Sequence, residues 1–297
     1  MPEAAEVAVA ATQLHDVAAG RLLVAVPVTH ERSVRHTDPV AVAGLAGRVV
    51  TGVRSHGKWT VVALDGTDVA LGIHLRMSGQ LLVAELGTPH PDRHVHATLH
   101  LAPRISFLRD TPCPSGTKFA GGVAADPIEV WFRDPRTFGE LRALPGGRPP
   151  GADDLFDPAV TGERLHALAS RRRAAVKPVL LDQQRVVAGI GSYLADEALH
   201  RAGISPVAPA GELASSAWTR ILEAARTIAV ESRAAGGVTL ADEGWVDLWG
   251  RPGRYAAQLR VHSRPRCITC GTETRAAVVG GRRARWCPSC QPARRRR

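Results

Sequence analysis

The sequence predicts a two-domain α+β protein. An antiparallel β-sandwich with flanking helices comes first, and a helical domain with a four-cysteine zinc β-hairpin finger follows. Three observations predict this. Residues 94–101 alternate polar and apolar side chains at a strict period of two, as a half-buried strand does. After a linker rich in Pro and Gly, apolar residues recur at helical spacing instead. Two Cys-x-x-Cys pairs stand near the C-terminal end.

The first half is predicted to be one leading helix followed by strands. Apolar residues from Val7 to Ala18 repeat at helical spacing, and Gly20 is well placed to end that helix. Strand-like runs follow at 22–28, 49–53, 59–64, 69–75, 95–101 and 128–132. The stretch 107–126, which carries Cys113, reads as a long loop or insertion to which the residues assign no role.

The clearest linker lies within 144–154, Leu-Pro-Gly-Gly-Arg-Pro-Pro-Gly-Ala-Asp-Asp. Beyond it, Leu165 and Leu168 begin a helical section, and 213–228 forms a long amphipathic helix that ends near Gly236-Gly237. The predicted boundaries are 1–144 for the N-terminal domain, 145–158 for the linker, 159–255 for the helical domain, 256–293 for the finger and 294–297 for a basic tail.

Composition and charge indicate a globular protein with a polyanionic partner. The 297 residues are 44% hydrophobic, and the formal net charge is +10 with a pI of about 10.3. We favour nucleic acid as the partner; the alternative is that a GC-rich genome and solubility alone produce the charge. No stretch reaches the length of a membrane span, and Glu3 and Glu6 replace the basic residues of a signal peptide. We therefore expect a cytoplasmic, nucleoid-associated protein, whose five cysteines bind metal rather than form disulfides.

The cysteine pairs predict one structural zinc ion. Cys267-x-x-Cys270 and Cys287-x-x-Cys290 are separated by sixteen residues, and each pair offers two thiolates at a tight turn. The segment between them has room for only a β-hairpin. It carries Arg275, Arg282, Arg283 and Arg285. A rigid basic hairpin favours contact with phosphates over the alternative of a merely solubilising surface.

Two further patterns carry chemistry. If Met1 is removed, which the sequence does not decide, Pro2 becomes an N-terminal secondary amine, which is nucleophilic near neutral pH and can form an iminium with an aldehyde-like carbon. Glu3 is placed to move protons. Gly189-Ile190-Gly191 precedes a predicted helix, whose first amides could approach an anion. The alternatives are an exposed terminus without function and an ordinary packing junction between helices.

Taken in order, these motifs resemble the formamidopyrimidine-DNA glycosylase family, of which endonuclease VIII is a sister branch. The resemblance spans nearly the whole chain. It rests on Pro2-Glu3 with Glu6, on Lys58 in Gly-Lys-Trp, on 74–79 (His-Leu-Arg-Met-Ser-Gly), on 134–139 (Asp-Pro-Arg-Thr-Phe-Gly), on the glycine turn and on the four-cysteine finger. It implies a helix-two-turn-helix architecture for the C-terminal domain.

The resemblance also implies an activity and a set of roles. It implies a monomeric, bifunctional glycosylase and AP lyase of base excision repair that acts on double-stranded DNA containing damaged bases or abasic sites. Oxidised purines, 8-oxoguanine and formamidopyrimidines, would be excised through a Schiff base on Pro2, followed by β,δ-elimination. Glu3 would move protons and Glu6 would position the terminus. Lys58 would belong to the catalytic residues with Pro2 and Glu3. The implied DNA contacts are Lys58, Arg282, Lys177 and Ser192 on phosphates and Met77, Arg136 and Phe138 in the gap left by the flipped base.

Four features depart from the family pattern, and they leave the lesion preference and the catalytic rate open. Ala4-Ala5 replace Leu-Pro behind the nucleophile, Ser192 replaces an asparagine, and Arg76 replaces a glycine beside Met77. The 107–126 insertion has no counterpart. The rival readings are a relative with shifted scope, acting on oxidised pyrimidines or bulky adducts, and a damaged-DNA-binding homologue without catalysis. A zinc-dependent transcription factor is disfavoured because the finger lacks a recognition helix.

Two remaining features, three histidines and the arginine tail, are assigned no catalytic role. His94, His96 and His100 are spaced by even numbers and share one strand face, where a polar surface is favoured over a second metal site. The tail Arg294–Arg297 either adds salt-dependent DNA affinity or has no specific role.

Overall fold

The computed structural model describes residues 2–104, 126–240 and 244–293, which divide into two compact units. The N-terminal unit comprises Met1–Pro2, Val7–Pro149 and Leu240–Pro252, and the C-terminal unit comprises Glu3–Glu6, Pro150–Thr239 and Gly253–Arg297. The unit changes inside the predicted linker. The short segment Glu3–Glu6 belongs to the C-terminal unit, and Leu240–Pro252 belongs to the N-terminal unit. The predicted boundaries, which cut the chain into consecutive ranges, do not include these two exchanges. Cys113, with residues 107–125, and the tail 294–297 lie outside the described residues.

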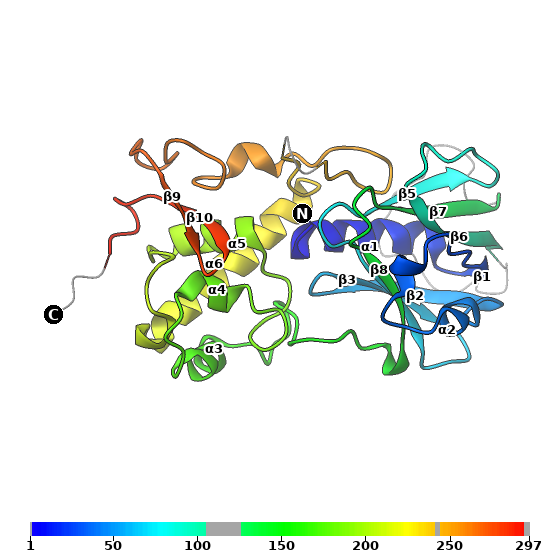
Figure 1. The fold of residues 1–297 in the computed structure, drawn as a ribbon, viewed down its shortest axis with the longest axis horizontal. Coiled ribbons are helices and arrows are strands. Elements are labelled where there is room, and N and C mark those ends of the chain that lie inside the picture. The colour runs from blue at the N-terminus through cyan, green and yellow to red at the C-terminus, as the bar shows by residue number, and fades with distance from the viewer. Residues whose placement is uncertain (1, 105–125, 241–243, 294–297) are drawn as a thin grey trace. The chain divides into compact units, whose positions relative to one another are not determined.

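An eight-stranded antiparallel sheet forms the N-terminal unit, in the order β5-β7-β6-β1-β2-β3-β4-β8 (Figure 1). Its strands are β1 (Arg21–Ala25), β2 (Arg48–His56), β3 (Trp59–Leu64), β4 (Ala70–His74), β5 (Gln80–Glu85), β6 (Val95–Arg104), β7 (Ile128–Arg133) and β8 (Glu140–Leu144). Six of them overlap the predicted runs, although β1 ends at Ala25, before the end of the predicted run 22–28. β5 and β8 were not predicted, because neither alternates clearly between buried and exposed residues.

The sheet has two parts that share the long strand β2 and one core. The first residues of β2 pair with β1, and the rest pair with β3. A single apolar cluster contains Leu71 of β4, Leu99 of β6 and Leu14 of α1 (Ala4–Ala18), all at most 1% exposed. Both parts of the sheet therefore pack around common side chains, as the predicted sandwich requires. The leading helix ends as predicted, before Gly20 at φ 80°. The unit also contains α2 (Pro39–Ala43) and the 3-10 turns η1 (Glu31–Val34) and η2 (Pro145–Gly147).

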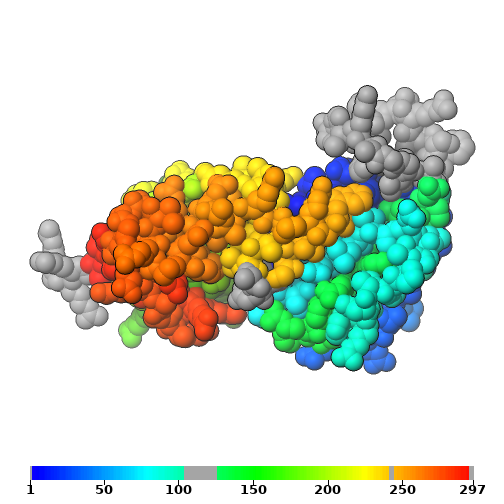
Figure 2. Space-filling view, turned by 90° about the horizontal axis from the view of Figure 1, so that it is seen from above, coloured from blue at the N-terminus to red at the C-terminus, as the bar shows by residue number. Residues whose placement is uncertain are grey.

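Helices dominate the C-terminal unit, which confirms the predicted change of period. They are α3 (Gly162–Ala169), α4 (Val176–Leu180), α5 (Ser192–Arg201) and α6 (Ser215–Ala234), with 3-10 turns η3 (Ala210–Glu212) and η4 (Tyr255–Gln258). Apolar residues of α6 at helical spacing, among them Ile221 and Ile228, are buried. The segment 253–270, orange in Figure 2, lies on the surface of this unit.

The predicted finger is a two-stranded hairpin of β9 (Arg275–Val279) and β10 (Arg282–Trp286). Val279 pairs with Arg282, so Gly280 and Gly281 alone make the turn, with φ of 57° and 76°. Two successive positive φ angles are the signature of a tight hairpin turn whose twist matches that of the strands. No helix within the described ranges is long and apolar enough to cross a bilayer.

Candidate active site and metal centre

The carboxylate of Glu3 caps the N-terminus of α5 in the C-terminal unit. Its Oε2 accepts hydrogen bonds from the amides of Gly191 (2.8 Å) and Leu194 (3.2 Å), and its Oε1 accepts one from Tyr193 (3.0 Å). The side chain is 2% exposed. These amides have no partners within the helix, and the helix dipole favours a negative charge at this end. The residue that follows Pro2 is thus held by three backbone donors.

Gly191 is required for this contact. A Cβ built on Gly191 would lie 2.1 Å from Cδ of Glu3 and 2.3 Å from its Oε1. No heavy atom can approach so closely, so any side chain at 191 would displace the carboxylate. The glycine turn that the sequence indicated as an anion site is filled by an anion of the chain itself.

Glu6 is a second buried carboxylate, 1% exposed, and it holds the terminal peptide. Its Oε2 accepts the N–H of Glu3 (2.8 Å), and its Oε1 accepts the N–H of Val238 (2.8 Å) and the hydroxyl of Tyr193 (3.0 Å). Burial raises the pKa of Glu6 above its ordinary value, and the hydrogen bonds only partly oppose this. Burial, with the charges of Glu6 and Glu3, raises the pKa of Tyr193 well above 10, so its hydroxyl remains a donor.

Tyr193 and Ser232 were not predicted as parts of this site. The Tyr193 hydroxyl lies 3.3 Å from the Ser232 Oγ, and that Oγ lies 3.4 Å from Glu6. Tyr193 belongs to the glycine-turn motif and could have been selected from it. Ser232 stands on the inner face of α6 with no pattern around it, so no sequence signal identifies it.

In the N-terminal unit, Pro2 is buried and Lys58 is 9% exposed. Lys58 lies in a two-residue turn, because His56 of β2 pairs with Trp59 of β3. Gly57 has φ 58° and takes the first position of that turn, where glycine is preferred. The hairpin places the lysine at its tip, as the family pattern implies.

The trio Met77, Arg136 and Phe138 lies on two loops that are tied together. The hydroxyl of Ser78 donates to Asp134, and Asp134 accepts the amides of Gly139 (2.6 Å) and Arg136 (3.3 Å). Met77 and Phe138 are 40% and 39% exposed, so neither belongs to the core. The guanidinium of Arg136 lies 5.7 Å from the centroid of the Phe138 ring. Phe138 and Arg136 therefore lie side by side, and the loop that carries the exposed Met77 is tied to theirs through Ser78 and Asp134.

Arg76 has a backbone conformation that is typical of glycine, the residue of the family pattern at this position. Its φ is 55°, in the left-handed region that glycine adopts without cost. Its guanidinium donates to the buried carboxylate of Glu140 at 2.5 Å. Burial raises the pKa of Glu140, but the hydrogen bonds from Arg76 and Arg142 outweigh that effect and lower it overall. The ion pair offsets the backbone strain beside Met77.

The four cysteines form one cluster that could hold a metal ion. Their Sγ atoms all lie within 4.8 Å of one another, with Cys267–Cys290 at 3.9 Å and Cys270–Cys290 at 3.5 Å. A tetrahedral zinc site with bonds near 2.3 Å separates its sulfurs by about 3.8 Å, so the cluster fits. Hydrogen bonds with Thr272 lower the pKa of the Cys270 thiol to about 6, whereas burial raises the pKa of the Cys287 and Cys290 thiols.

The histidines are not part of a metal cluster within the described residues, whose only such group is the four cysteines. His96 is 6% exposed, and its Nε2 lies 2.9 Å from the carbonyl oxygen of Asp134. His100 lies 3.7 Å from Glu129. His96 is therefore buried and does not lie on the predicted polar surface.

The predicted phosphate contacts of the C-terminal unit differ in exposure. Arg282 is exposed on β10. The Oγ of Ser192, at the start of α5, lies 3.1 Å from Nζ of Lys177 and 3.4 Å from the carbonyl oxygen of Arg283, so this side chain is turned toward the finger. Lys177 is fully buried at 0% exposure, and it is ion-paired with Asp196 at 2.7 Å.

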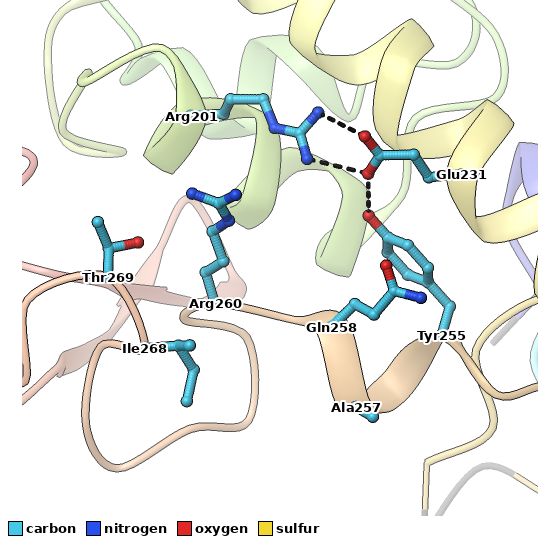
Figure 3. A pocket seen from close by; sticks show the side chains of 8 residues that line it. All are labelled: Arg201, Glu231, Tyr255, Ala257, Gln258, Arg260, Ile268 and Thr269. Carbon is cyan, nitrogen blue, oxygen red and sulfur yellow. Dashed lines mark hydrogen bonds and ion pairs between the residues drawn. The ribbon is translucent and has the colours of Figure 1, made fainter.

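A surface hollow of about 480 Å³ lies elsewhere in the same unit (Figure 3). Arg201 of α5 donates to both carboxylate oxygens of Glu231 of α6, at 3.1 and 2.9 Å, and the Tyr255 hydroxyl donates to the same carboxylate at 2.5 Å. The hydrogen bond from Arg201 lowers the pKa of Glu231. This network joins α5, α6 and η4, and the exposed Arg260 lines the hollow beside it.

Known proteins resemble this chain along nearly its whole length. The family model for the formamidopyrimidine-DNA glycosylase N-terminal domain matches residues 1–141, and the model for the H2TH domain of the same glycosylase matches 151–243. The formamidopyrimidine-DNA glycosylase of Roseiflexus sp. (strain RS-1) is 35% identical over 300 residues, covering 98% of this chain and 100% of that one. The protein of the same name from Xanthomonas campestris pv. campestris (strain B100) is 36% identical over 249 residues, covering 83% of each chain.

A solved structure agrees with these matches. The crystal structure of the MutM (Fpg) protein from Thermus thermophilus superposes with a TM-score of 0.78 at 28% identity, covering 98% of both chains. The paired domain models, the relatives above 30% identity and the shared architecture lead to one conclusion: the chain belongs to the formamidopyrimidine-DNA glycosylase family.

Proposed function

We propose that this protein is a bifunctional DNA glycosylase and AP lyase that excises oxidised purines, such as 8-oxoguanine and formamidopyrimidines, from duplex DNA. The observation that carries the proposal is the anchoring of the N-terminus. Glu3 is bound by three amides of α5, and the peptide that joins it to Pro2 donates to Glu6. A terminus without function needs no such set of buried contacts.

Pro2 is the proposed nucleophile once Met1 is removed. Its nitrogen forms a bond to C1′ of the deoxyribose as the bond from C1′ to the base breaks, and the departing base takes up a proton. Opening of the sugar leaves an iminium between Pro2 and C1′, as with other amine nucleophiles on carbonyl-like carbons. The iminium acidifies the neighbouring carbon, so the 3′ phosphate and then the 5′ phosphate leave by β- and δ-elimination. Water finally releases Pro2.

Glu3 is the proposed proton-transfer group of this reaction, and Glu6 keeps the terminus in place. General acid–base catalysis by one positioned side chain contributes about 10²–10⁴-fold. Lys58 and Arg282 are the proposed contacts to phosphates flanking the lesion. Ser192 remains a predicted phosphate contact, but its hydroxyl is directed toward Lys177 and Arg283, and Glu3 occupies the first amides of α5. The Lys177 phosphate contact remains a prediction that its burial does not support.

Met77, Arg136 and Phe138 are the proposed filling of the gap that a flipped base leaves. Extruding a base costs a few kcal/mol of unstacking and unpairing. The exposure of Met77 and Phe138, with Arg136 against the Phe138 ring, supports this role, because an apolar wedge can stack where the base was and an arginine can pair with its orphaned partner.

Zinc is the proposed occupant of the four-cysteine cluster, where it is structural. All four tetrahedral positions are taken by Cys267, Cys270, Cys287 and Cys290, so none is open for substrate. The ion would supply no step of the reaction. It would hold the β9–β10 hairpin, and with it Arg282, in a fixed conformation.

Borohydride trapping tests the function. The purified protein is incubated with a duplex that contains a single 8-oxoguanine and with an abasic-site duplex, and the Pro2→Gly variant is treated in parallel. We expect a covalent adduct on both duplexes and its loss in the variant.

Each other outcome selects a rival. Trapping on the abasic duplex alone would keep the chemistry and move the base specificity to oxidised pyrimidines or bulky adducts. Binding without an adduct on either duplex would leave a damaged-DNA-binding homologue without catalysis and would contradict the proposal.

A further inference from the structure

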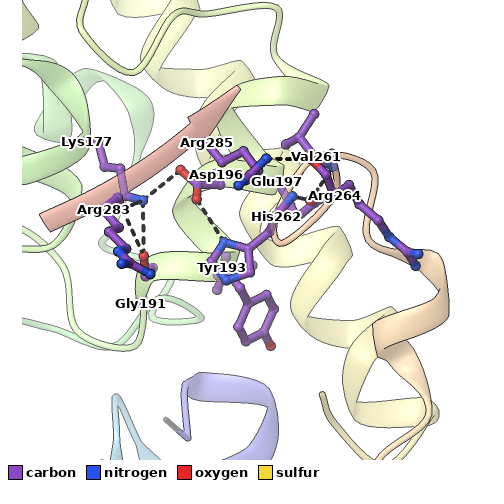
Figure 4. Close-up of polar contacts among 12 residues, drawn as sticks. Lys177, Gly191, Tyr193, Asp196, Glu197, Val261, His262, Arg264, Arg283 and Arg285 are labelled. Atoms are coloured by element: carbon purple, nitrogen blue, oxygen red, sulfur yellow. Dashed lines mark hydrogen bonds and ion pairs between the residues drawn. The ribbon is translucent and has the colours of Figure 1, made fainter. Parts of the chain in front are cut away.

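The amino group of Lys177 is surrounded by partners on three sides (Figure 4). Its Nζ donates to Ser192 Oγ at 3.1 Å, to Asp196 Oδ1 at 2.7 Å and to the carbonyl oxygen of Arg283 at 2.5 Å. An ammonium group has three N–H donors, so these contacts use all of them. The side chain is 0% exposed. Lys177 could reach a phosphate only by breaking a buried ion pair, which is strongly unfavourable.

The same face of α5 holds the segment that leads into the finger. The second carboxylate oxygen of Asp196 lies 2.8 Å from Nδ1 of His262. The neighbouring Glu197, 4% exposed, accepts the amides of Arg260 (2.8 Å), Val261 (2.9 Å) and His262 (2.7 Å). Two adjacent acidic residues of α5 therefore fix the chain just before Cys267.

The tip of the finger rests on α4 beside Lys177. A Cβ on Gly280 would lie 2.4 Å from Cγ of Pro178, so the turn packs against this proline with no room for a side chain. At Gly281, with a similar positive φ of 76°, a Cβ would meet nothing within 4 Å. Arg282 thus stands between two fixed points, the packed tip at Gly280 and the carbonyl of Arg283 that Lys177 holds.

We propose that Lys177 is a positioning residue that sets the location of Arg282 by holding β10 against the first turn of α5, instead of binding phosphate itself. This inference rests on the proposed phosphate contact of Arg282. The first turn of α5 also binds Glu3, so the proton-transfer group and the phosphate-binding arginine are held by one rigid element. We therefore expect Arg282 to hold the phosphate beside the lesion at a fixed position relative to Glu3.

A double-mutant cycle tests the assignment. The variants Lys177→Met, Arg282→Ala and the pair together are titrated with an abasic-analogue duplex by fluorescence anisotropy at several salt concentrations, and zinc content and melting temperature confirm that each is folded. We expect each single variant to weaken binding about tenfold and to lower the salt slope by about one phosphate contact, and the pair to be no weaker than Arg282→Ala alone. General destabilisation would not change the salt slope.

If the losses of binding free energy in the two single variants add in the double variant, and its salt slope falls by a further amount of about 0.9, Lys177 binds phosphate itself. This result would overturn the inference. Unchanged binding by Lys177→Met would overturn it too. If Arg282→Ala binds like the unmodified protein, the premise fails and the inference with it, while the trapping result on Pro2 stands by itself.

A second pair of variants keeps the inference testable if Lys177→Met does not fold. Gly280→Ala pushes the tip away from Pro178 without changing any charge, and Gly281→Ala places the same methyl group on a similarly strained residue in open space. We expect Gly280→Ala to lose affinity and salt slope as Arg282→Ala does, and Gly281→Ala to lose neither. If the two glycine variants bind DNA with the same affinity and the same salt slope, the contact between Gly280 and Pro178 does not position Arg282, and the inference is overturned.

Discussion

At the scale of single residues, function depends on close approaches that leave no free space. Glu3 reaches the amides of α5 only because Gly191 has no side chain. At Arg76 the chain tolerates the opposite case, a large residue at positive φ, because the guanidinium pairs with Glu140. One position therefore cannot accept any side chain, and the other can accept one that forms a compensating ion pair.

Gly191→Ala should therefore impair catalysis. The new methyl group must push the Glu3 carboxylate away, and a displacement of about 1 Å at a reacting group can cost about 10²-fold in rate. Single-turnover cleavage of an 8-oxoguanine duplex measures the effect. Gly52→Ala is the matched control, because its Cβ would meet only His15 at 3.9 Å, an ordinary contact. Full activity of Gly191→Ala would contradict the proposed role of Glu3.

At the scale of elements, the finger is too small to fold on its own side chains. Val278 in β9 is 72% exposed, and the cluster of buried residues around the finger consists of Val261, Cys267 and Cys287 with Cys290 beside them. So small an apolar cluster contributes little burial energy, and small domains of this kind depend on a metal.

We accordingly expect one zinc ion per chain and a loss of finger structure without it. Cys270→Ser should retain less zinc and bind duplex DNA about tenfold or more weakly, since the hairpin arginines lose their fixed positions. Elemental analysis and anisotropy measure the two effects. Ser289→Ala, an exposed residue between Cys287 and Cys290, serves as the control and should change neither. A protein free of zinc with full affinity would contradict the metal assignment.

At the scale of the whole molecule, a formal charge of +10 favours binding to any nucleic acid. A salt titration should therefore distinguish two contributions to DNA binding, the sequence-independent phosphate contacts and the recognition of the lesion. We expect the logarithm of the association constant to fall linearly with the logarithm of salt concentration, with the same slope for undamaged and 8-oxoguanine duplexes and a constant offset between them. Anisotropy titrations measure both lines. A steeper slope on the damaged duplex would mean that the lesion recruits additional phosphate contacts.

Much of the architecture was predictable because it depends on local spacing. Strict alternation in 95–101 identifies a strand whichever sheet it joins, and helical spacing in 213–228 identifies α6. The cysteine pairs predict the cluster since two turns suffice to gather four thiols. By contrast, β5 and β8 escape prediction because they pair at the edges of the sheet, where burial is uneven.

The sequence by itself thus determined the leading helix, six of the eight sheet strands, the helical character of the second half and the four-cysteine cluster. Through ordered motifs it also identified Pro2, Glu3 and Glu6 as candidates. Only the tertiary structure decided their partners. Glu6 meets Val238 from 232 residues away, and Lys177 meets Arg283 from 106 residues away. A lysine in a motif looks the same whether it faces solvent or a buried aspartate. Its burial is set by elements distant in the chain, and burial decides whether it binds a phosphate or holds a strand in place.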